Sequence, residues 1–307
     1  MSLFNDEQIR QQVERLPIPF DAYGVDPFGI SKRHLIRAYS PFARMYRSYL
    51  NVTVFGGEHI PERGRGLVIG NHSGGVGADA AMVFTSLLLN PTHPRLGHGM
   101  AEYFFNTKPY AGLLLSRLGH LTGLPEHAEM LLEAERLVVA FPEGQRGALK
   151  LYKHRYQLER FGTGFMRLAL KKKTPIIPFA FIGGEEAFPI VHKFDFVTKL
   201  IGTPALPVAP QLVLWPLPVS CQIYYGEPMR FEGDGSEPDD VIAGYVGEVK
   251  DTIRALIARG LAARPAAFTR KRVEHAPPLE PSAVAPAARR ATRSPAPPRR
   301  SEPAPPP

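Results

Sequence analysis

Two side chains suited to proton transfer, His72 and Asp79, stand seven positions apart in a glycine-rich stretch. An imidazole titrates near neutral pH and can take a proton from a hydroxyl group. A carboxylate that accepts from the other ring nitrogen fixes the tautomer and stabilises the imidazolium that forms. We therefore regard His72 and Asp79 as a candidate catalytic pair. The alternative is a tight turn in which Asp79 only caps the next helix.

The residues that follow the histidine offer backbone N–H groups to a developing negative charge. Ser73, Gly74 and Gly75 come directly after it, and glycine lets the chain turn tightly with its amides exposed. We predict that these three residues form an oxyanion-binding turn. Ser73 is not expected to act as a hydrolase nucleophile, because no G-x-S-x-G sequence surrounds it.

A second cluster, FPEGQRG, directly follows the apolar run LVVA. Arg146 can hold a phosphate group through two parallel hydrogen bonds. Glu143 can accept from a hydroxyl group or hold Arg146. The alternative is an exposed turn with an incidental ion pair, which contributes about 0–1 kcal/mol to stability.

Both clusters have to be positioned by neighbouring elements. Short apolar runs predict strands at 51–57, 66–70, 121–123, 137–141, 175–182 and 219–225. Helical patterns predict helices at 79–89, 125–136, 161–173 and 239–263. Each cluster follows a predicted strand, and α/β proteins place functional loops at strand ends.

Short apolar runs between helical segments are typical of a sheet that is buried on both faces. We predict an α/β fold: a single domain with a mixed, largely buried central sheet covered by helices, with N-terminal amphipathic helices and a long C-terminal helix. The expected parts are a helical region at 1–50, the main domain at 51–230, a helix packed on it at 231–263, and a disordered tail at 264–307.

The chain has 307 residues, 44% of them apolar, and a formal net charge of +8. The predicted tail holds nine lysines and arginines against three acids, and twelve of the 32 prolines. Such a segment buries too little apolar surface to fold. Because the charge is concentrated there, we expect no nucleic-acid partner for the folded part. A salt-sensitive nucleic-acid contact made by the tail is an alternative.

The single cysteine, Cys221, excludes an internal disulfide and a cysteine-based zinc site, and we expect no metal. The first residues lack the apolar core of a signal peptide. The uncharged stretch 200–226 contains five prolines, which argues against a membrane-spanning helix. We therefore expect a cytoplasmic protein that is peripheral to the membrane.

The stretch 31–50 interleaves basic and aromatic residues at roughly helical spacing, and Pro41 is expected to break or kink the helix. Such a helix can lie on an anionic lipid surface. It can equally pack its aromatic residues on the core and leave its charges in water. The sequence leaves both interpretations open.

Three segments in this order resemble the glycerolipid and lysophospholipid acyltransferase superfamily, and in particular its 1-acylglycerol-3-phosphate acyltransferase-like members. They are NHSGG with its aspartate, FPEG with its arginine, and the proline-bearing strand PIIP. The resemblance spans about residues 51–228. It has one departure: six residues separate His72 from Asp79, where the family typically has four.

The resemblance implies an enzyme that moves a fatty acyl group from a thioester, acyl-CoA or acyl carrier protein, to a hydroxyl group of a glycerolipid or lysophospholipid. No further cofactor is implied. His72 would be the general base and Asp79 would orient it. Glu143, Gly144 and Arg146 would bind the acceptor. The longer spacing motivates an alternative, a catalytically silent lipid-binding protein of the same fold.

Overall fold

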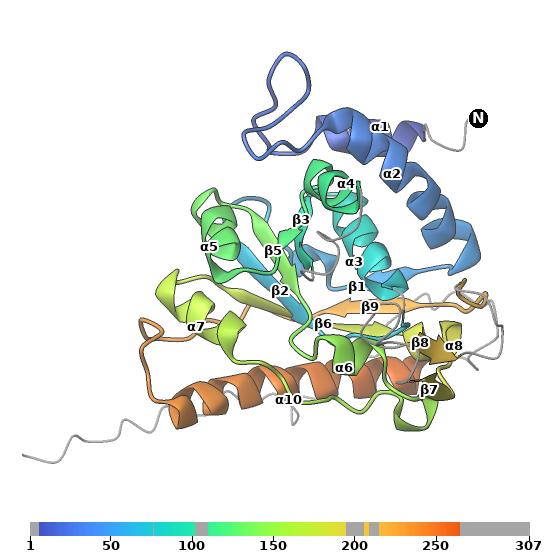
Figure 1. The fold of residues 1–307 in the computed structure, drawn as a ribbon, viewed down its shortest axis with the longest axis vertical. Helices are drawn as coiled ribbons and strands as arrows, with labels where there is room; N and C mark the ends of the chain where they lie inside the picture. Colours follow the sequence, from blue (N-terminus) through green and yellow to red (C-terminus); the bar gives the residue numbers. More distant parts are fainter. Residues whose placement is uncertain (1–5, 76, 102–109, 195–205, 209–214, 265–307) are drawn as a thin grey trace, which may run out of the picture. The chain divides into compact units, whose positions relative to one another are not determined.

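The computed structural model describes residues 6–75, 77–101, 110–194, 206–208 and 215–264, which all belong to one compact unit. A seven-stranded sheet runs through it in the order β1-β9-β6-β2-β5-β3-β4 (Figure 1). All neighbouring strands are parallel except β6 and β9, so the sheet is mixed as predicted. The strands are β1 (Thr53–Phe55), β2 (Gly66–Gly70), β3 (Gly97–Ala101), β4 (Leu121–Thr122), β5 (Leu137–Ala140), β6 (Ile176–Ile182) and β9 (Gln222–Tyr225).

All six predicted strands are present, and β3 is an addition that the sequence did not indicate. Its sequence, GHGMA, lacks the β-branched residues that favour strands. Its glycines make room for neighbours: a Cβ on Gly97 would lie 2.7 Å from Leu87 Cδ1, and a Cβ on Gly99 would lie 2.7 Å from Phe84 Cζ. Packing against residues that are distant in the sequence therefore stabilises this strand.

Helices cover both faces of the sheet (Figure 1). One face carries α5 (Pro125–Glu133), α7 (Gly164–Lys171) and α10 (Asp239–Ala263). The other carries α3 (Ala78–Leu88), with α1 (Glu7–Glu14), α2 (Lys32–Arg44) and α4 (Ala111–Arg117) beside it. Residues of β2 alternate between these layers, since Leu67 and Ile69 join the first core and Val68 the second. Burial on both faces explains the apolar runs.

Helix α2 is not broken at Pro41 but continues past it and ends in a π-helical turn at Met45–Tyr49. Its residues Leu35 and Tyr39 are buried, whereas Arg33 and Arg37 are exposed. The aromatic stripe is therefore at least partly a core face.

Two short helices, α6 (Gln145–Ala148) and α8 (Gly184–Ala187), follow strands of the sheet, and β7 (His192–Phe194) pairs with β8 (Leu206–Val208) in a separate antiparallel sheet. Among the described residues, no helix is both long and apolar enough to cross a membrane. Arg264, which the sequence assigned to the tail, is buried and forms an ion pair with Glu186 at 2.8 Å. The rest of the predicted tail, and much of the uncharged stretch 200–226, lie outside the described residues.

Candidate active site

The two predicted clusters meet at one edge of the sheet. β2 and β5 are parallel neighbours, so the residues beyond their carboxyl ends lie at the same edge. His72 follows β2 and Glu143 follows β5. The backbone N–H of His72 donates to Glu143 Oε1 at 3.0 Å, which joins the two loops directly.

The histidine and the aspartate are in contact despite the long spacing. His72 Nδ1 lies 2.7 Å from Asp79 Oδ2. Asp79 is fully buried and also accepts from the backbone amides of Ser73 at 2.7 Å and Ala80 at 2.8 Å. It is not the cap of α3, because Gly77 occupies that position. The carboxylate is thus held by three donors and faces the imidazole.

Glycines make the longer turn possible. Gly74, Gly75 and Gly77 have φ angles of +79°, +63° and +77°, a region that other residues rarely adopt. A Cβ on Gly75 would lie 2.7 Å from Phe188 Cδ1, so the turn also passes too close to its neighbour for a side chain. These residues allow the chain to return to the histidine over six positions.

Not all amides of this turn face open space. The Ser73 amide donates to Asp79, and the Gly75 amide donates to the carbonyl oxygen of Ala148 at 2.9 Å. For the Gly74 amide, no acceptor is found among the described residues. Of the three residues predicted to bind an oxyanion, Gly74 therefore keeps the amide best suited to that role.

The residues on either side of His72 attach the loop to β6 and its extension. The Asn71 side chain donates to the Phe181 carbonyl oxygen at 2.9 Å and accepts from the Phe181 amide at 2.7 Å. Ser73 is 1% exposed, and its Oγ would lie 2.1 Å from a Cβ on Gly184. The hydroxyl is thus packed against a neighbouring backbone, in line with the expectation that it is not a nucleophile. Nothing in the sequence marked Asn71 as a fastening residue.

An aromatic stack fixes the orientation of the imidazole. The rings of His72 and Phe141 are stacked with their centroids 4.4 Å apart, and Phe141 meets Phe179 edge-on at 5.6 Å. A Cβ on Gly70 would lie 2.4 Å from Phe179 Cζ. Glycine at the end of β2 therefore makes room for the ring that supports the stack.

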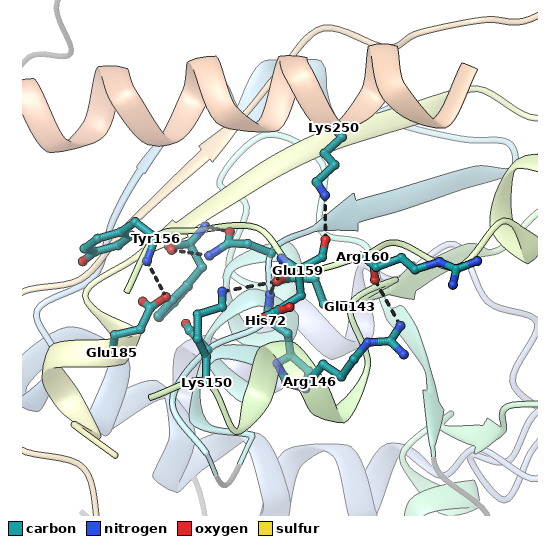
Figure 2. A network of polar contacts seen from close by, with 12 residues as sticks. His72, Glu143, Arg146, Lys150, Tyr156, Glu159, Arg160, Glu185 and Lys250 are labelled. Atoms are coloured by element: carbon teal, nitrogen blue, oxygen red, sulfur yellow. Dashed lines mark hydrogen bonds and ion pairs between the residues drawn. The ribbon is translucent and has the colours of Figure 1, made fainter. Parts of the chain in front are cut away.

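Glu143 connects two segments of the chain (Figure 2). It is 1% exposed; Oε1 accepts from the His72 amide and Oε2 accepts from the Glu159 amide at 2.7 Å. Lys150 Nζ lies 3.2 Å from Oε2 as its ionic partner. Glu143 does not hold Arg146, which was one of the two sequence-based expectations. Its carboxylate instead fastens the histidine loop from within the protein.

Arg146 points away from Glu143 (Figure 2). It is exposed, and its Nη2 donates to the Arg160 carbonyl oxygen at 3.1 Å. Gly144 has φ +58° and ψ −148°, a conformation that is essentially restricted to glycine. The turn thereby presents the guanidinium to solvent beside the site, where it is accessible to an anionic group.

Gly147 lets α6 approach the histidine loop. A Cβ at this position would lie 2.6 Å from Glu143 Cβ and 3.1 Å from His72 Cβ. The FPEGQRG sequence therefore places a helix against the catalytic pair through a residue that sequence reasoning did not single out.

Residues 156–160, which we call the strap, cross between the site and α10 and belong to no helix or strand. Lys250 of α10 donates to the Glu159 carbonyl oxygen at 2.7 Å, and the Tyr156 amide donates to Glu185 Oε1 at 3.2 Å (Figure 2). The sequence predicted a helix from residue 161, but α7 starts only at Gly164. Contacts with Glu143, Glu185 and Lys250 hold the segment before α7 outside the helix.

Lys150 and Glu185 are further buried charges next to the site. The Lys150 ammonium is paired with Glu143 but lacks hydrogen-bond geometry with any side chain among the described residues. Glu185 is 3% exposed, and burial raises its pKa to about 7 although the Lys150 charge acts in the opposite direction.

The described residues contain no group of three or more His, Cys, Asp or Glu side chains arranged to hold a metal ion. His98 is fully buried with its Nδ1 2.9 Å from the Gly119 carbonyl oxygen, and burial lowers its pKa to about 3. Burial likewise lowers the pKa of His120 to about 4. These histidines are neutral parts of the core.

Residues 51–182 match the model of the Acyltransferase family. The matched region runs from β1 to the end of β6 and contains both loops of the site.

Curated relatives are similar over most of the chain. An uncharacterized protein of Mycobacterium leprae is 33% identical over 256 residues, which cover 79% of this chain and 69% of that protein. An uncharacterized protein of Mycobacterium tuberculosis is 32% identical over 254 residues, covering 79% and 71%. A chicken protein named "DGAT1/2-independent enzyme synthesizing storage lipids" is 25% identical over 231 residues, covering 75% and 65%.

Among solved structures, the 1-acyl-sn-glycerophosphate acyltransferase PlsC from Thermotoga maritima is similar with a TM-score of 0.48 and 18% sequence identity. The match covers 74% of this chain and 83% of that one.

Proposed function

Because the chain belongs to the glycerolipid acyltransferase superfamily, we propose that it transfers a fatty acyl group from a thioester donor, acyl-CoA or acyl carrier protein, to a hydroxyl group of a glycerolipid or lysophospholipid. The observation that carries this proposal is the His72–Asp79 contact of 2.7 Å at the carboxyl edge of the sheet. A buried carboxylate on Nδ1 leaves Nε2 as the basic atom of the ring. The contact supports this proposal over the alternative of a catalytically silent protein, which the longer spacing motivated.

The proposed reaction needs no acyl-enzyme intermediate. His72 Nε2 takes the proton of the acceptor hydroxyl while its oxygen attacks the thioester carbonyl carbon. The tetrahedral intermediate collapses with loss of the thiolate, which receives the proton from the imidazolium. General base catalysis of this kind contributes about 10²–10⁴-fold to the rate. In this proposal Asp79 stabilises the imidazolium, and the Gly74 amide donates to the oxyanion.

Arg146 is the group proposed to bind a phosphate of the acceptor. It is exposed, follows β5 in the same loop as Glu143, and donates a hydrogen bond to the Arg160 carbonyl oxygen. A guanidinium binds a phosphate in two-point geometry. Glu143 contributes by holding the loop, because its two oxygens are already engaged by backbone amides.

The test is a lipid-product analysis of the purified protein. Wild type, supplied with labelled acyl-CoA or acyl carrier protein and a panel of lyso-acceptors, is expected to form the acylated lipid. His72→Ala should abolish product. His127→Ala, a change to a histidine on α5 that contacts only the Thr122 carbonyl oxygen among the described residues, should not. A folded wild type that is inactive with every donor and acceptor would overturn the proposal.

We also propose that the enzyme works on an anionic membrane surface, with α2 and α4 as the contact. Tyr110, Leu113 and Leu114 are 85%, 59% and 51% exposed and line a shallow groove on α4. Next to them lies His34, whose pKa is lowered by partial burial and by the charges of nearby arginines, namely Arg117, Arg33 and Arg37. Apolar side chains bordered by guanidinium groups suit a lipid surface of negative charge.

Vesicle sedimentation tests this contact. Binding to vesicles of phosphatidylcholine with phosphatidylglycerol is expected to exceed binding to phosphatidylcholine alone and to weaken with salt. Leu113→Asp/Leu114→Asp should lose binding by about tenfold or more. Met130→Asp, a change at a comparably exposed apolar residue on α5, is the matched control. Equal loss in both variants would contradict a contact through α4.

A further inference from the structure

The Glu143 carboxylate binds two segments of the site, and the Lys150 ammonium pairs with this carboxylate. Glu143 accepts from the amide of His72 and from the amide of Glu159 in the strap. Lys150 Nζ lies 3.2 Å from Glu143 Oε2, and the side chains of both residues are at most 2% exposed. Figure 2 shows the lysine beneath the carboxylate, on the side away from Arg146.

Because the pair is buried, the Glu143 carboxylate needs the charge of Lys150 to stay ionised. A buried carboxylate stays ionised only if hydrogen bonds and an opposite charge replace the water that it loses. Two backbone amides supply the hydrogen bonds, and Lys150 supplies the charge. Arg146 points elsewhere and does not share this task.

Lys150 also acts on a second buried carboxylate. Its charge stabilises the ionised form of Glu185, whose Oε1 accepts from the Tyr156 amide at the start of the strap. Both ends of the strap are therefore bound by carboxylates that the same ammonium faces. Lys250 of α10 also holds the strap, through the Glu159 carbonyl oxygen, and its charge interacts with Glu143 from farther away than Lys150.

We propose that Lys150 is a positioning residue for acyl transfer: its ammonium keeps Glu143 in place, and Glu143 in turn fixes the loop that carries His72 and the strap beside it. Only the expected change in kcat rests on the proposed function, acyl transfer; the positioning of the loop does not. Lys150 touches neither the reacting atoms nor the exposed guanidinium, so its removal affects the geometry of the base and not the binding of the donor.

Kinetics give the first test. Lys150→Met is expected to lower kcat by about 10- to 100-fold, the effect of a small displacement of a catalytic group, with KM for the acyl donor changed by less than about twofold. Lys150→Arg should restore part of the loss because it returns the charge. Lys172→Met, a change to a lysine that pairs with the surface residues Glu129 and Glu133, is the control and should leave kcat unchanged.

A double-mutant cycle keeps the proposal falsifiable if Lys150→Met folds poorly. In the Glu143→Gln background the buried charge is gone, so adding Lys150→Met is expected to lower kcat by less than about twofold further. Independent, multiplicative losses from the two substitutions would overturn the assignment of Lys150 to Glu143.

Amide hydrogen exchange followed by mass spectrometry separates this proposal from the proposed function, because it needs no substrate. In Lys150→Met, or in the double variant if the single one is unfolded, peptides with the amides of His72 and Glu159 should exchange faster than in wild type. Peptides from α5 should not. Unchanged exchange at both amides overturns the positioning role, even if the wild-type enzyme is active. Faster exchange in an inactive wild type upholds the role of Lys150 in holding the loop and contradicts only the acyl transfer.

Discussion

The two loops of the site lie at the same edge of the same parallel sheet, yet they are built differently. The loop after β2 closes on itself, because the imidazole of His72 and the carboxylate of Asp79 are only seven positions apart. The loop after β5 depends on distant partners: Glu143 is fixed by the amides of His72 and Glu159 and by Lys150. The His72–Asp79 contact can be understood from residues of one loop, whereas the contacts of Glu143 depend on residues elsewhere in the chain.

The two loops also differ in what their buried carboxylates face. In the first loop the buried carboxylate faces the imidazole that we propose as the general base. In the second loop the buried carboxylate faces backbone, and the residue available to a substrate is the exposed Arg146. Substitutions in the two loops should therefore affect different steps.

The largest effect is expected from Asp79→Asn. The amide has one oxygen and can accept from only one of the two turn amides, because Ser73 and Ala80 donate to different oxygens of Asp79. It does not stabilise an imidazolium, and it favours the wrong tautomer of His72. We expect kcat to fall by about 10²- to 10⁴-fold with the overall fold retained. Steady-state kinetics with a circular dichroism control measure this. A loss of less than about threefold would mean that the first loop does not work as a catalytic pair.

Gly147→Ala tests how tightly the second loop is packed against the first. The new methyl group would lie 2.6 Å from Glu143 Cβ, so α6 or the carboxylate has to move. We expect the free energy of unfolding to drop by about 1–3 kcal/mol and kcat to decrease. Gly244→Ala on the exposed face of α10 meets no atom within 4 Å and should stabilise by roughly 0.5–1 kcal/mol. Urea denaturation measures the change in the free energy of unfolding for both variants. Equal changes would show that α6 can move to accommodate the methyl group.

Arg146→Ala should separate binding from chemistry. Loss of the guanidinium is expected to raise KM for a phosphate-bearing acceptor by about tenfold, whereas kcat at saturation changes less. A neutral glyceride acceptor should show no such increase. Should KM rise equally for both acceptors, Arg146 would be acting on the loop and not on a phosphate.

The last expected effect concerns stability and not catalysis, and it involves Glu185 next to the second loop. Burial raises the pKa of Glu185 from its ordinary 4.5 to about 7, so the folded state binds a proton more tightly than the unfolded state. The free energy of unfolding should therefore fall as pH rises from about 4.5 to 7, by at most about 1.4 kcal/mol per pH unit from this group. Glu185→Gln should remove that slope.

The measurement is urea denaturation at several pH values between 5 and 7.5. Glu133→Gln, at a glutamate whose side chain is 62% exposed, should keep the wild-type slope. Identical pH dependence in wild type and Glu185→Gln would mean that this carboxyl titrates in its ordinary range.

The sequence predicts contacts between residues that are close along the chain, and it does not predict contacts between distant residues. β2, β5 and β6 are continuous apolar runs, so these strands were predicted correctly. His72 and Asp79 are close along the chain, and the expected contact between them is present. Asn71 binds Phe181, 110 positions away, and no local pattern indicates such a contact. The burial of Lys150 was not predicted, because a lysine in a mixed stretch is typical of a solvated surface.

Two local predictions, the start of α7 and the effect of Pro41, differ from the structure for a related reason. Helical periodicity begins near residue 161, but Glu143 and Lys250 hold the strap, and α7 begins only at Gly164. Pro41 suggested a break or a kink, and α2 continues through it without a break. In both cases contacts between distant parts of the fold outweigh local preference.

The order of the strands has a consequence for how the protein is made. In the described sheet β1 is joined only to β9, with Thr53 opposite Gln222. A ribosome releases β1 early but must add nearly 170 more residues before its partner exists. The growing chain therefore exposes an unpaired apolar edge for most of its synthesis, and chaperone protection of the nascent N-terminal part is most needed until β9 has emerged.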